Sequence, residues 1–428
     1  MERVQRIAGH IFGSFMSANG SLSAAPTSTL MSSSQPADDD VVICWSKRTA
    51  VGKAGKGSFK DTPAEDLLAA LFKAVVKDTK IDANKIGDCV IGNVLQPTAG
   101  AATTRMAMFL GDLPKEVPCA AVNRQCSSSL QAMATVAAAI KTGSIDCGLA
   151  GGVESMSMYK ITSGVDEKKL SPAVAKNDLA AACLISMGIT SENVAAKYNI
   201  SRETQDAMAA NSHAKALAAQ KQGLFDSEIL PVTTTIKDKA GNRKPVTVTK
   251  DEGPREGTTV EGLAKLKAAF KQGGSTTAGN ASQVSDGASL CLMARRSVAK
   301  EMGLPIVARF RSFAVVGVDP NLMGIGPAFA IPKALEKAGL KVPDIDIWEI
   351  NEAFASQATM SIQTLGIDAS KVNPKGGAIA LGHPLGCTGG RQLATLLPEL
   401  KRQGKKLGVI SMCIGSGMGA ASVIESEQ

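Results

Sequence analysis

The stretch AAVNRQCSSSLQAMATVAAAIKTGSIDCGLAGG, residues 120–152, carries the pattern that decides the fold class. It begins with a short strand at Ala120, continues as a long Ala-rich helix from Cys126 to Ile140, and ends in a second strand, Cys147–Gly152. A buried helix between two short strands is typical of parallel strands joined by a crossover. The stretch therefore predicts an α/β fold in which mainly parallel sheets are covered by helices.

The same order of elements recurs in the C-terminal third of the chain. A strand ending at Ile350 precedes a helix over Glu352–Leu365, and a Gly-rich turn, Gly376–Gly390, opens a helix that runs to Lys401. The strand Leu407–Met412 then leads into a second glycine-rich turn. Because strands, glycine-rich turns and helices follow one another in the same order, we predict two copies of one folding unit.

We divide the chain into three parts on this basis. Residues 1–37 contain one acidic residue and many serines, and are predicted to be a targeting or processed segment. Residues 38–298 form the first half, which includes a polar, Lys-rich insertion at about 160–274, with helices around 191–222, that could overhang the site. Residues 303–426 form the second half.

Composition and charge exclude several classes of protein. The 428 residues are 44% hydrophobic, enough for a large core, whereas 4% aromatic residues and a net charge of +8 argue against a nucleic-acid surface. The longest apolar run, Ala132–Ile140, is far shorter than the ~18 residues of a membrane span. Nine cysteines without a Cys-x-x-Cys pair predict neither a disulfide framework nor a zinc site, so we expect free thiols in a reducing compartment.

The first residues contain a candidate address. The segment from Arg3 to Ile11 resembles the N-terminal peroxisomal import signal, in which Arg, apolar residues and a His recur. On a helix Val4, Ile7 and Ile11 would share one face, as binding to an import receptor requires, although Ile11 departs from the Leu or Ala usual at the last position. We predict import into the peroxisome (glyoxysome) through residues 3–11, with a mitochondrial transit peptide as the alternative.

Cys126 is the first candidate for chemistry. It lies at the start of the Ala-rich helix, where unpaired N–H groups and the helix dipole favour a thiolate. A nucleophilic Cys also needs a general base and a donor for the oxyanion that forms when it attacks. Most cysteines in such positions are inert core residues, so this position alone leaves both interpretations open.

Later turns supply candidate partners for this thiol. His383 lies in the Gly-rich turn, where it has room to act as a general base, although a His near a helix cap can instead bind a backbone carbonyl. Cys413 ends a buried strand before a glycine nest whose N–H groups suit an oxyanion. Asn351 also follows a buried strand and is either a ligand contact or a helix cap. The remaining His of the folded part, His213, is expected on a surface helix with no role in chemistry.

Together these segments resemble the thiolase family over about Val41 to Ile424, in the same order along the chain. The turn around Cys387, the segment beginning at Met187 and the N-terminal signal are similar to those of the peroxisomal 3-ketoacyl-CoA thiolases. The motifs that carry the resemblance are Asn-Arg-Gln-Cys126-Ser-Ser, Val-Glu-Ser-Met156-Ser, Thr-Ala-Gly-Asn-Ala-Ser282-Gln-Val-Ser-Asp-Gly, Asn351-Glu-Ala-Phe-Ala, Gly-His383-Pro-Leu-Gly-Cys-Thr-Gly and Cys413-Ile-Gly-Ser-Gly-Met-Gly.

The resemblance implies the thiolase fold, which has two duplicated βαβαβαββ halves in α-β-α-β-α layers, an inserted loop domain and a homodimer. It implies thiolytic cleavage of 3-ketoacyl-CoA by CoA, with neither a metal nor a redox cofactor. The acyl acceptor would be Cys126, its base His383 and the second acid/base Cys413.

Further roles follow from the same resemblance. Asn351 would complete one oxyanion hole with His383, and the N–H groups of Cys126 and Gly415 would form the other. The remaining carried-over residues bind substrate: Arg255 and Ser282 would contact CoA, and Met156 and Phe354 would line the acyl pocket.

Four points stay open on the sequence alone. A biosynthetic acetoacetyl-CoA thiolase shares every catalytic motif, and a non-catalytic CoA-binding relative is a second alternative. A redox role, in which Cys183 pairs with Cys126, is a third hypothesis. Ser129 stands where the family usually has Gly just after Cys-Ser-Ser, and it puts the rate rather than the type of reaction in question.

Overall fold

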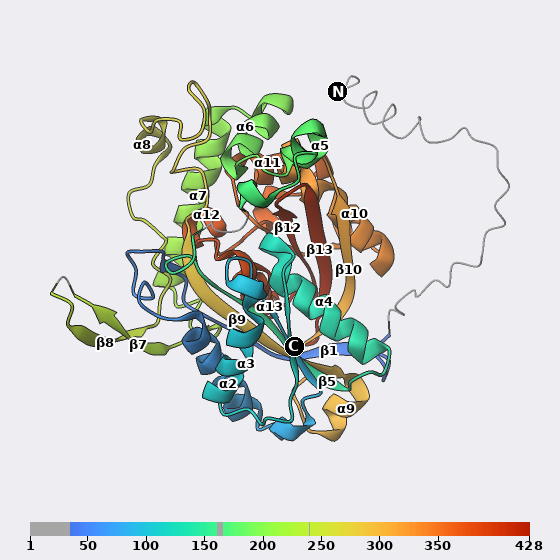
Figure 1. Ribbon diagram of the computed structural model, residues 1–428. Helices are drawn as coiled ribbons and strands as arrows, with labels where there is room; N and C mark the ends of the chain where they lie inside the picture. Colours follow the sequence, from blue (N-terminus) through green and yellow to red (C-terminus); the bar gives the residue numbers. More distant parts are fainter. Residues whose placement is uncertain (1–34, 161–165, 239) are drawn as a thin grey trace. The chain divides into compact units, whose positions relative to one another are not determined.

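The computed structural model describes residues 35–160, 166–238 and 240–428 (Figure 1). The predicted import signal at residues 3–11 therefore lies outside the described residues. The first half contains β1 (Val41–Thr49), β2 (Gly52–Lys53), α2 (Ala64–Thr79), β3 (Asp88–Gly92), α3 (Ala101–Leu110), β4 (Cys119–Val122), α4 (Ser128–Lys141), β5 (Cys147–Ser155) and, after a long insertion, β9 (Ser285–Arg295).

The insertion between β5 and β9 has more regular structure than its composition predicts. Its two longest helices lie where helices are expected, and a hairpin, β7 with β8, is additional. The elements are α5 (Asp178–Ala182), α6 (Met187–Lys197), α7 (Arg202–Lys221), β6 (Ile229–Leu230), β7 (Val232–Lys237), β8 (Arg243–Val248) and α8 (Val260–Ala264).

The second half repeats the first. After α9 (Arg296–Glu301) it contains β10 (Ala308–Gly317), α10 (Gly326–Ala338), β11 (Ile347–Ile350), α11 (Ala355–Leu365), α12 (Ala378–Leu381), α13 (Thr388–Gln403), β12 (Leu407–Ile414) and β13 (Met418–Ser426). From the outer edge inward, the first half runs β4, β3, β5, β9, β1. The second runs Val372, β11, β12, β13, β10, with Val372 contributing an isolated parallel bridge to Trp348. In both halves the third strand in chain order lies at the outer edge, and the second, fourth, fifth and first strands follow inward. This shared order confirms the predicted duplication.

The sheets are less parallel than the sequence predicts. In each half the outer pairings are parallel, such as β3 with β5 and β11 with β12. The inner ones are antiparallel, such as β5 with β9 and β12 with β13. In the second half the reason is local: β12 turns directly into β13, and Ile414 pairs with Met418, so no crossover helix can intervene. The expectation of mainly parallel sheets is wrong for these inner strands.

Three apolar clusters bury the sheets between layers of helices. One holds α2 against the first half's strands, and another holds α10 against those of the second half. Between them α4 and α13 pack on each other and on strands of both halves, through Leu130, Met133 and Val136 of α4 and Leu393, Leu396 and Leu400 of α13. The order is therefore α-β-α-β-α, and α4 and α13 form the central layer (Figure 1).

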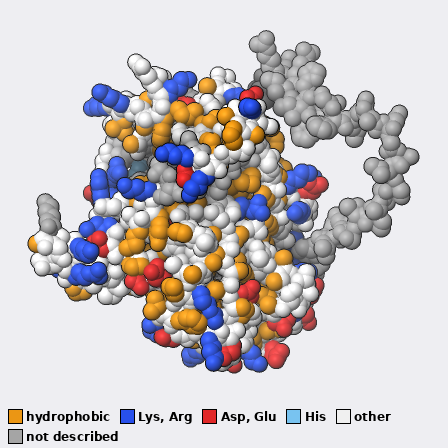
Figure 2. All heavy atoms as spheres, viewed as in Figure 1, with side chains coloured by type: hydrophobic (Ala, Val, Ile, Leu, Met, Phe, Trp, Pro, Cys, Tyr) orange, Lys and Arg blue, Asp and Glu red, His pale blue; other side chains and the backbone are white. Residues whose placement is uncertain are grey.

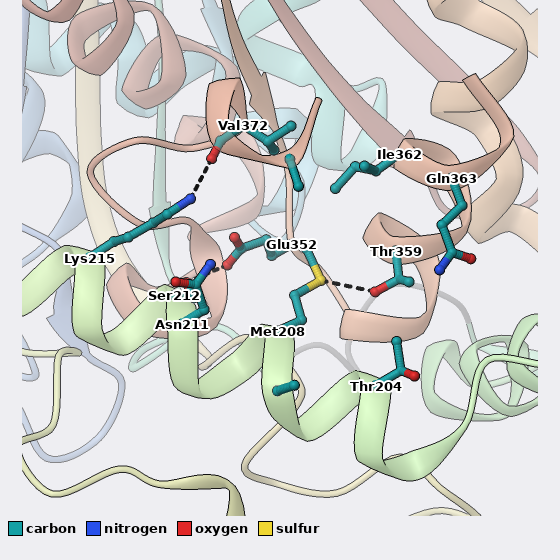
Figure 3. A pocket seen from close by; sticks show the side chains of 12 residues that line it. Thr204, Met208, Asn211, Ser212, Lys215, Glu352, Thr359, Ile362, Gln363 and Val372 are labelled. Carbon is teal, nitrogen blue, oxygen red and sulfur yellow. Dashed lines mark hydrogen bonds between the residues drawn. The ribbon is translucent and has the colours of Figure 1, made fainter. Parts of the chain in front are cut away.

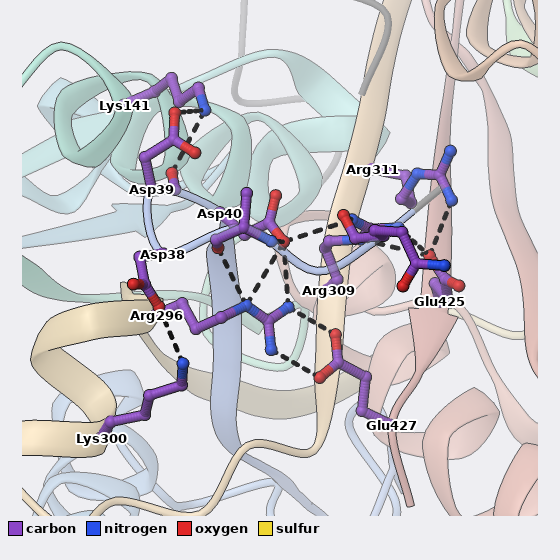
Figure 4. A network of polar contacts seen from close by, with 12 residues as sticks. Asp38, Asp39, Asp40, Lys141, Arg296, Lys300, Arg309, Arg311, Glu425 and Glu427 are labelled. Carbon is purple, nitrogen blue, oxygen red and sulfur yellow. Dashed lines mark hydrogen bonds and ion pairs between the residues drawn. The ribbon is translucent and has the colours of Figure 1, made fainter. Parts of the chain in front are cut away.

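Three consecutive aspartates fix the start of β1 (Figure 4). Asp38 pairs with Lys300 at 2.8 Å, and Asp39 pairs with Lys141 of α4. Asp40 accepts from Arg296 at 3.1 Å and from Arg309 at 3.2 Å. These ion pairs thus hold the start of β1 in place directly after the predicted targeting segment. No helix of the described residues is long and apolar enough to cross a membrane.

Candidate active site

Cys126 lies in a tight turn between β4 and α4. The turn Gln125–Ser127 is a single 3-10 turn, and Gln125 before the thiol has φ 45°, a left-handed conformation that costs energy for a residue with a side chain. Gln125 donates from Nε2 to Ser416 Oγ at 2.9 Å. This bond joins the Cys126 turn to the hairpin between β12 and β13, so the two halves meet at the thiol.

The electrostatics of Cys126 differ from the expectation. Burial raises the pKa of its thiol to about 11, and the N–H of Gly415, which favours the thiolate, only partly opposes this. A helix N-terminus lowers the pKa of a thiol, but Cys126 is partly buried, and the loss of hydration raises its pKa by more than the helix dipole lowers it. The thiol is therefore protonated in the resting state and depends on a neighbouring base.

His383 is the residue that the sequence predicts as that base. The turn before it requires glycine, because Gly382 has φ 108° and a Cβ there would lie 2.3 Å from Ser285 Oγ. The imidazole is 5% exposed, and its Nδ1 lies 2.7 Å from Oγ1 of Thr388, the first residue of α13. Burial, together with the positive charge of Arg391, lowers the pKa of His383 to about 3. The ring is therefore neutral in the resting state.

Asn351 completes one side of the site. Its Nδ2 lies 3.4 Å from Nε2 of His383, and its backbone N–H donates to the Ser411 carbonyl of β12 at 2.9 Å. The side chain is fully buried, and its Oδ1 has no hydrogen-bond partner among the described residues. A buried amide with spare capacity beside an imidazole is suited to hold a water or an oxyanion.

Cys413 and Gly415 complete the other side. Burial raises the pKa of Cys413 strongly, and Cys126 raises it further; β12, which carries Cys413, packs against the turn Gln125–Ser127. Gly415 cannot carry a side chain, since a Cβ there would lie 2.0 Å from Oε1 of Gln125. The structure thus brings Cys126, His383, Cys413, Asn351 and Gly415 to one place.

Two apolar clusters flank these polar groups. Met156 is buried with Leu95 and Leu385 in a cluster that Cys126 also joins. Phe354 packs on the cluster of Cys413. Because one cluster lies against each sulfur, both are positioned to hold an apolar chain.

The two residues predicted to contact CoA stand differently. Ser282 is half-buried beside the site, and its N–H donates to the carbonyl of Ala353 at 3.0 Å. Arg255 is exposed on the insertion, and no contact links it to the catalytic cluster within the described residues. Its backbone N–H donates to Nδ1 of His213 at 3.2 Å, so His213 is a buried structural residue and not a surface one.

Sequence reasoning missed Glu154, which lies two residues before Met156. Its carboxyl is fully buried and accepts from the N–H groups of Val94, Leu95 and Gly386 at 3.0–3.2 Å. A carboxylate directly after the buried run 147–153 was the available signal.

Glu352, next to Asn351, joins the insertion to the core. It accepts from Ser212 of α7 at 2.6 Å and from Asn373 at 2.8 Å. Beside it a cavity of about 300 Å³ opens between α7 and α11, where Lys215 donates to the Val372 carbonyl at 2.8 Å (Figure 3). Neither Cys126 nor Cys413 lines this cavity, so the cavity is separate from the two candidate thiols.

Among the cysteines, which all lie in the described residues, only Cys183 is exposed. Its Sγ lies 3.9 Å from the Ser416 carbonyl, in the hairpin that Gln125 binds. All nine cysteines are free thiols in this structure, and pairing of Cys183 with Cys126 stays a prediction.

Comparison with known proteins identifies the family. Residues 41–297 match the model described as "Thiolase, N-terminal domain", and residues 304–426 match "Thiolase, C-terminal domain". The chain belongs to the thiolase family. The crystal structure of the dimeric peroxisomal thiolase of Saccharomyces cerevisiae is 50% identical, covers 92% of this chain and 99% of its own, and superposes with a TM-score of 0.85.

Curated thiolases resemble the chain over nearly its whole length. The rat protein named 3-ketoacyl-CoA thiolase B, peroxisomal, is 57% identical over 99% of both chains. The Arabidopsis thaliana protein named 3-ketoacyl-CoA thiolase 1, peroxisomal, is 53% identical over 96% of this chain and 93% of its own. Such identity over full length places this thiolase beside the peroxisomal 3-ketoacyl-CoA thiolases, as its motifs predict.

Proposed function

We propose that the protein is a peroxisomal 3-ketoacyl-CoA thiolase, an acyltransferase that cleaves 3-ketoacyl-CoA with CoA into acetyl-CoA and a shortened acyl-CoA in fatty-acid β-oxidation. The observation that carries the proposal is the meeting of Cys126, Cys413 and the neutral His383 at one point, in a chain 57% identical to a thiolase of that name. The relatives named peroxisomal come from animals, yeast and plants, which supports the same location here.

The first half-reaction transfers the acyl group to the enzyme. Cys126 attacks the 3-keto carbon and its proton passes to His383, which the neutral ring can accept. The bond between the second and third carbons then breaks, and Cys413 protonates the departing carbanion to give acetyl-CoA. Because the pKa of Cys413 is raised, its thiol is protonated beforehand, as this step needs.

The second half-reaction releases the product. The Cys413 thiolate takes the proton from incoming CoA, whose sulfur attacks the acyl-Cys126 thioester. The shortened acyl-CoA leaves, and the released Cys126 thiolate takes back the proton that His383 held, which restores both side chains. An oxyanion forms in each half-reaction. The Asn351–His383 pair would hold one oxyanion, and the N–H groups of Cys126 and Gly415 would hold the other. Nucleophile, base and acid are all side chains, so the proposed reaction draws on no metal or redox cofactor.

Substrate contacts and assembly are parts of the same proposal. Met156 and Phe354 would line the acyl pocket, and Ser282 and Arg255 would bind CoA. A homodimer is supported by the dimeric yeast thiolase and by an open sheet edge: β4 pairs only with β3 within the described residues. The neighbouring α3 exposes Met106, Phe109 and Leu110, and apolar side chains appear on the face it occupies (Figure 2). An import receptor would read residues 3–11.

Thiolytic rates against a series of 3-ketoacyl-CoA chain lengths test the function. We expect activity to extend well beyond acetoacetyl-CoA. Activity confined to that shortest substrate would instead identify the biosynthetic alternative. A 3-ketoacyl-CoA incubation without CoA should leave an acyl mass adduct on the Cys126 peptide, and its absence would identify a non-catalytic relative.

A further inference from the structure

Helix α13, which follows the His383 turn, begins without a cap from its own segment. The first N–H groups of any helix lack partners inside it, and the side chain of the N-cap residue usually accepts from the second or third of them. Here the N-cap residue is Cys387, and its side chain makes no capping hydrogen bond. The third residue of α13 is Gly390, so its N–H needs an acceptor from elsewhere.

That acceptor is Ser129. Its Oγ accepts from the Gly390 N–H at 2.9 Å, and the side chain is fully buried. Ser129 belongs to the first turn of α4, three residues after Cys126. The helix that follows the Cys126 turn in the first half therefore caps the helix that follows His383 in the second half.

The two helix starts are in contact through their backbones as well. A Cβ at Gly389 would lie 2.8 Å from the backbone nitrogen of Leu130, and one at Gly390 would lie 2.2 Å from Ser289 Oγ. Ser289 in turn donates to the Cys387 carbonyl at 3.0 Å. The two helix starts therefore pack closely around the Ser129–Gly390 hydrogen bond.

The cap is connected to the imidazole by one further bond. Thr388, two residues before Gly390, holds His383 Nδ1 through its Oγ1 at 2.7 Å. We infer that Ser129 is a positioning residue, whose hydroxyl caps α13 and so sets the His383 ring relative to the Cys126 thiol. The inference rests on the proposed function, because it assigns His383 the role of base.

Ser129→Ala tests the inference, since it removes the hydroxyl and keeps the packing. We expect kcat for thiolysis to fall about five-fold, the equivalent of one neutral hydrogen bond, with the KM for CoA changed less than about two-fold. We also expect iodoacetamide to alkylate Cys126 more slowly at neutral pH, with the midpoint of its pH profile moved upward. Mass spectrometry of the Cys126 peptide follows this reaction separately from the other thiols.

Ser422→Ala is the matched control. Ser422 is a fully buried Ser of β13 that donates to the Ser312 carbonyl of β10 at 2.7 Å, a bond that joins two strands and does not involve α4 or α13. It should lower the melting temperature similarly while kcat and the alkylation profile stay at wild-type values. Ser129→Gly, with the residue usual in the family, is the second variant if Ser129→Ala folds poorly.

Wild-type kcat and an unchanged alkylation profile in both Ser129 variants would overturn the inference, and so would a rise in KM alone. Failure of the wild-type chain itself to cleave 3-ketoacyl-CoA would reject the proposed function instead, so the two failures are distinguishable.

Discussion

The N–H of Gly386 donates to Oε2 of Glu154 at 3.0 Å, across 232 positions of sequence. The same carboxyl accepts from the N–H groups of Val94 and Leu95, so one buried group holds the His383 turn against the end of β3. Burial raises the pKa of Glu154 to about 7, more than its backbone donors lower it.

This raised pKa predicts how stability depends on pH. An unfolded Glu loses its proton near 4.5, whereas the folded Glu154 keeps it until about 7. The folded state therefore binds more protons between these values, and the free energy of unfolding should fall by about 3 kcal/mol as the pH rises through them. Glu154→Gln should remove this part of the decline, measured by chemical denaturation at about pH 5 and pH 8.

Glu349, whose pKa burial also raises to about 7, supplies an independent decline that Glu154→Gln leaves in place. A variant with the full wild-type slope would show that Glu154 is ionised throughout.

Cys126→Ala and Cys413→Ala should fail at different steps. Without Cys126 no acyl-enzyme can form. Without Cys413 the thiol of Cys126 still accepts an acyl group from an activated thioester, but the carbanion finds no acid and carbon–carbon cleavage is lost. Acyl adduct mass and thiolytic rate, measured on both variants, check this division, which equal loss of both activities would contradict.

Gln392→Met should loosen β11 and β12, the strands that lead to Asn351 and carry Cys413. Gln392 of α13 is fully buried, and its Nε2 donates to the carbonyls of Glu349 at 2.8 Å and Ser411 at 3.2 Å. These two carbonyls lie two residues before Asn351 and Cys413, so one amide sets the spacing of both. We expect about 1–3 kcal/mol of lost stability from the two lost hydrogen bonds, while the Ser411 carbonyl keeps the Asn351 N–H as a donor. A reduced kcat should accompany it, and steady-state kinetics that match wild type would argue against the spacing role.

Asp40→Asn should unfasten the start of β1. Asp40 pairs with Arg296 and Arg309, whose side chains are 5% and 2% exposed. Each guanidinium keeps a second carboxylate, Glu427 for Arg296 and Glu425 for Arg309, so the substitution removes charged hydrogen bonds without leaving an unpaired charge. We expect a loss of about 2 kcal/mol in the free energy of unfolding. Asp38→Asn, which breaks only the exposed pair with Lys300, is the control and should change stability much less. Equal losses of stability in the two variants would show that the buried Asp40 ion pairs stabilise the fold no more than the exposed Asp38–Lys300 pair.

Phe109→Glu should weaken the proposed dimer. Phe109 is 47% exposed on α3 beside the open edge of β4. A charge there would be buried against the partner, so light scattering at micromolar concentration should detect monomers. Phe329→Glu on α10, at a side chain 48% exposed, is the matched control and should remain dimeric. The α3 face is excluded as the interface if both variants keep the wild-type mass.

Short motifs pointed to most of the candidate site because its residues lie in turns that follow a strand or precede a helix. Cys126, His383 and Cys413 were identifiable from glycine-rich turns and helix starts nearby. The raised pKa of Cys126 was not, because burial is a property of the assembled fold. Glu154 and Ser129 were missed as supports for the same reason, since each binds a backbone N–H of the second half, at Gly386 and Gly390, more than 200 residues away. The antiparallel return of β13 depends on a turn too short to show a pattern.

The matching strand order of the two halves has a historical consequence. The turn after the third strand leads to Cys126 in one half and to His383 in the other, each at the entry to a central helix. A single ancestral copy would have carried identical turns, so it could have assembled a symmetric pocket only by pairing with itself. Within one polypeptide each turn can change without the other, so equivalent positions of the two halves can supply a thiol on one side and an imidazole on the other.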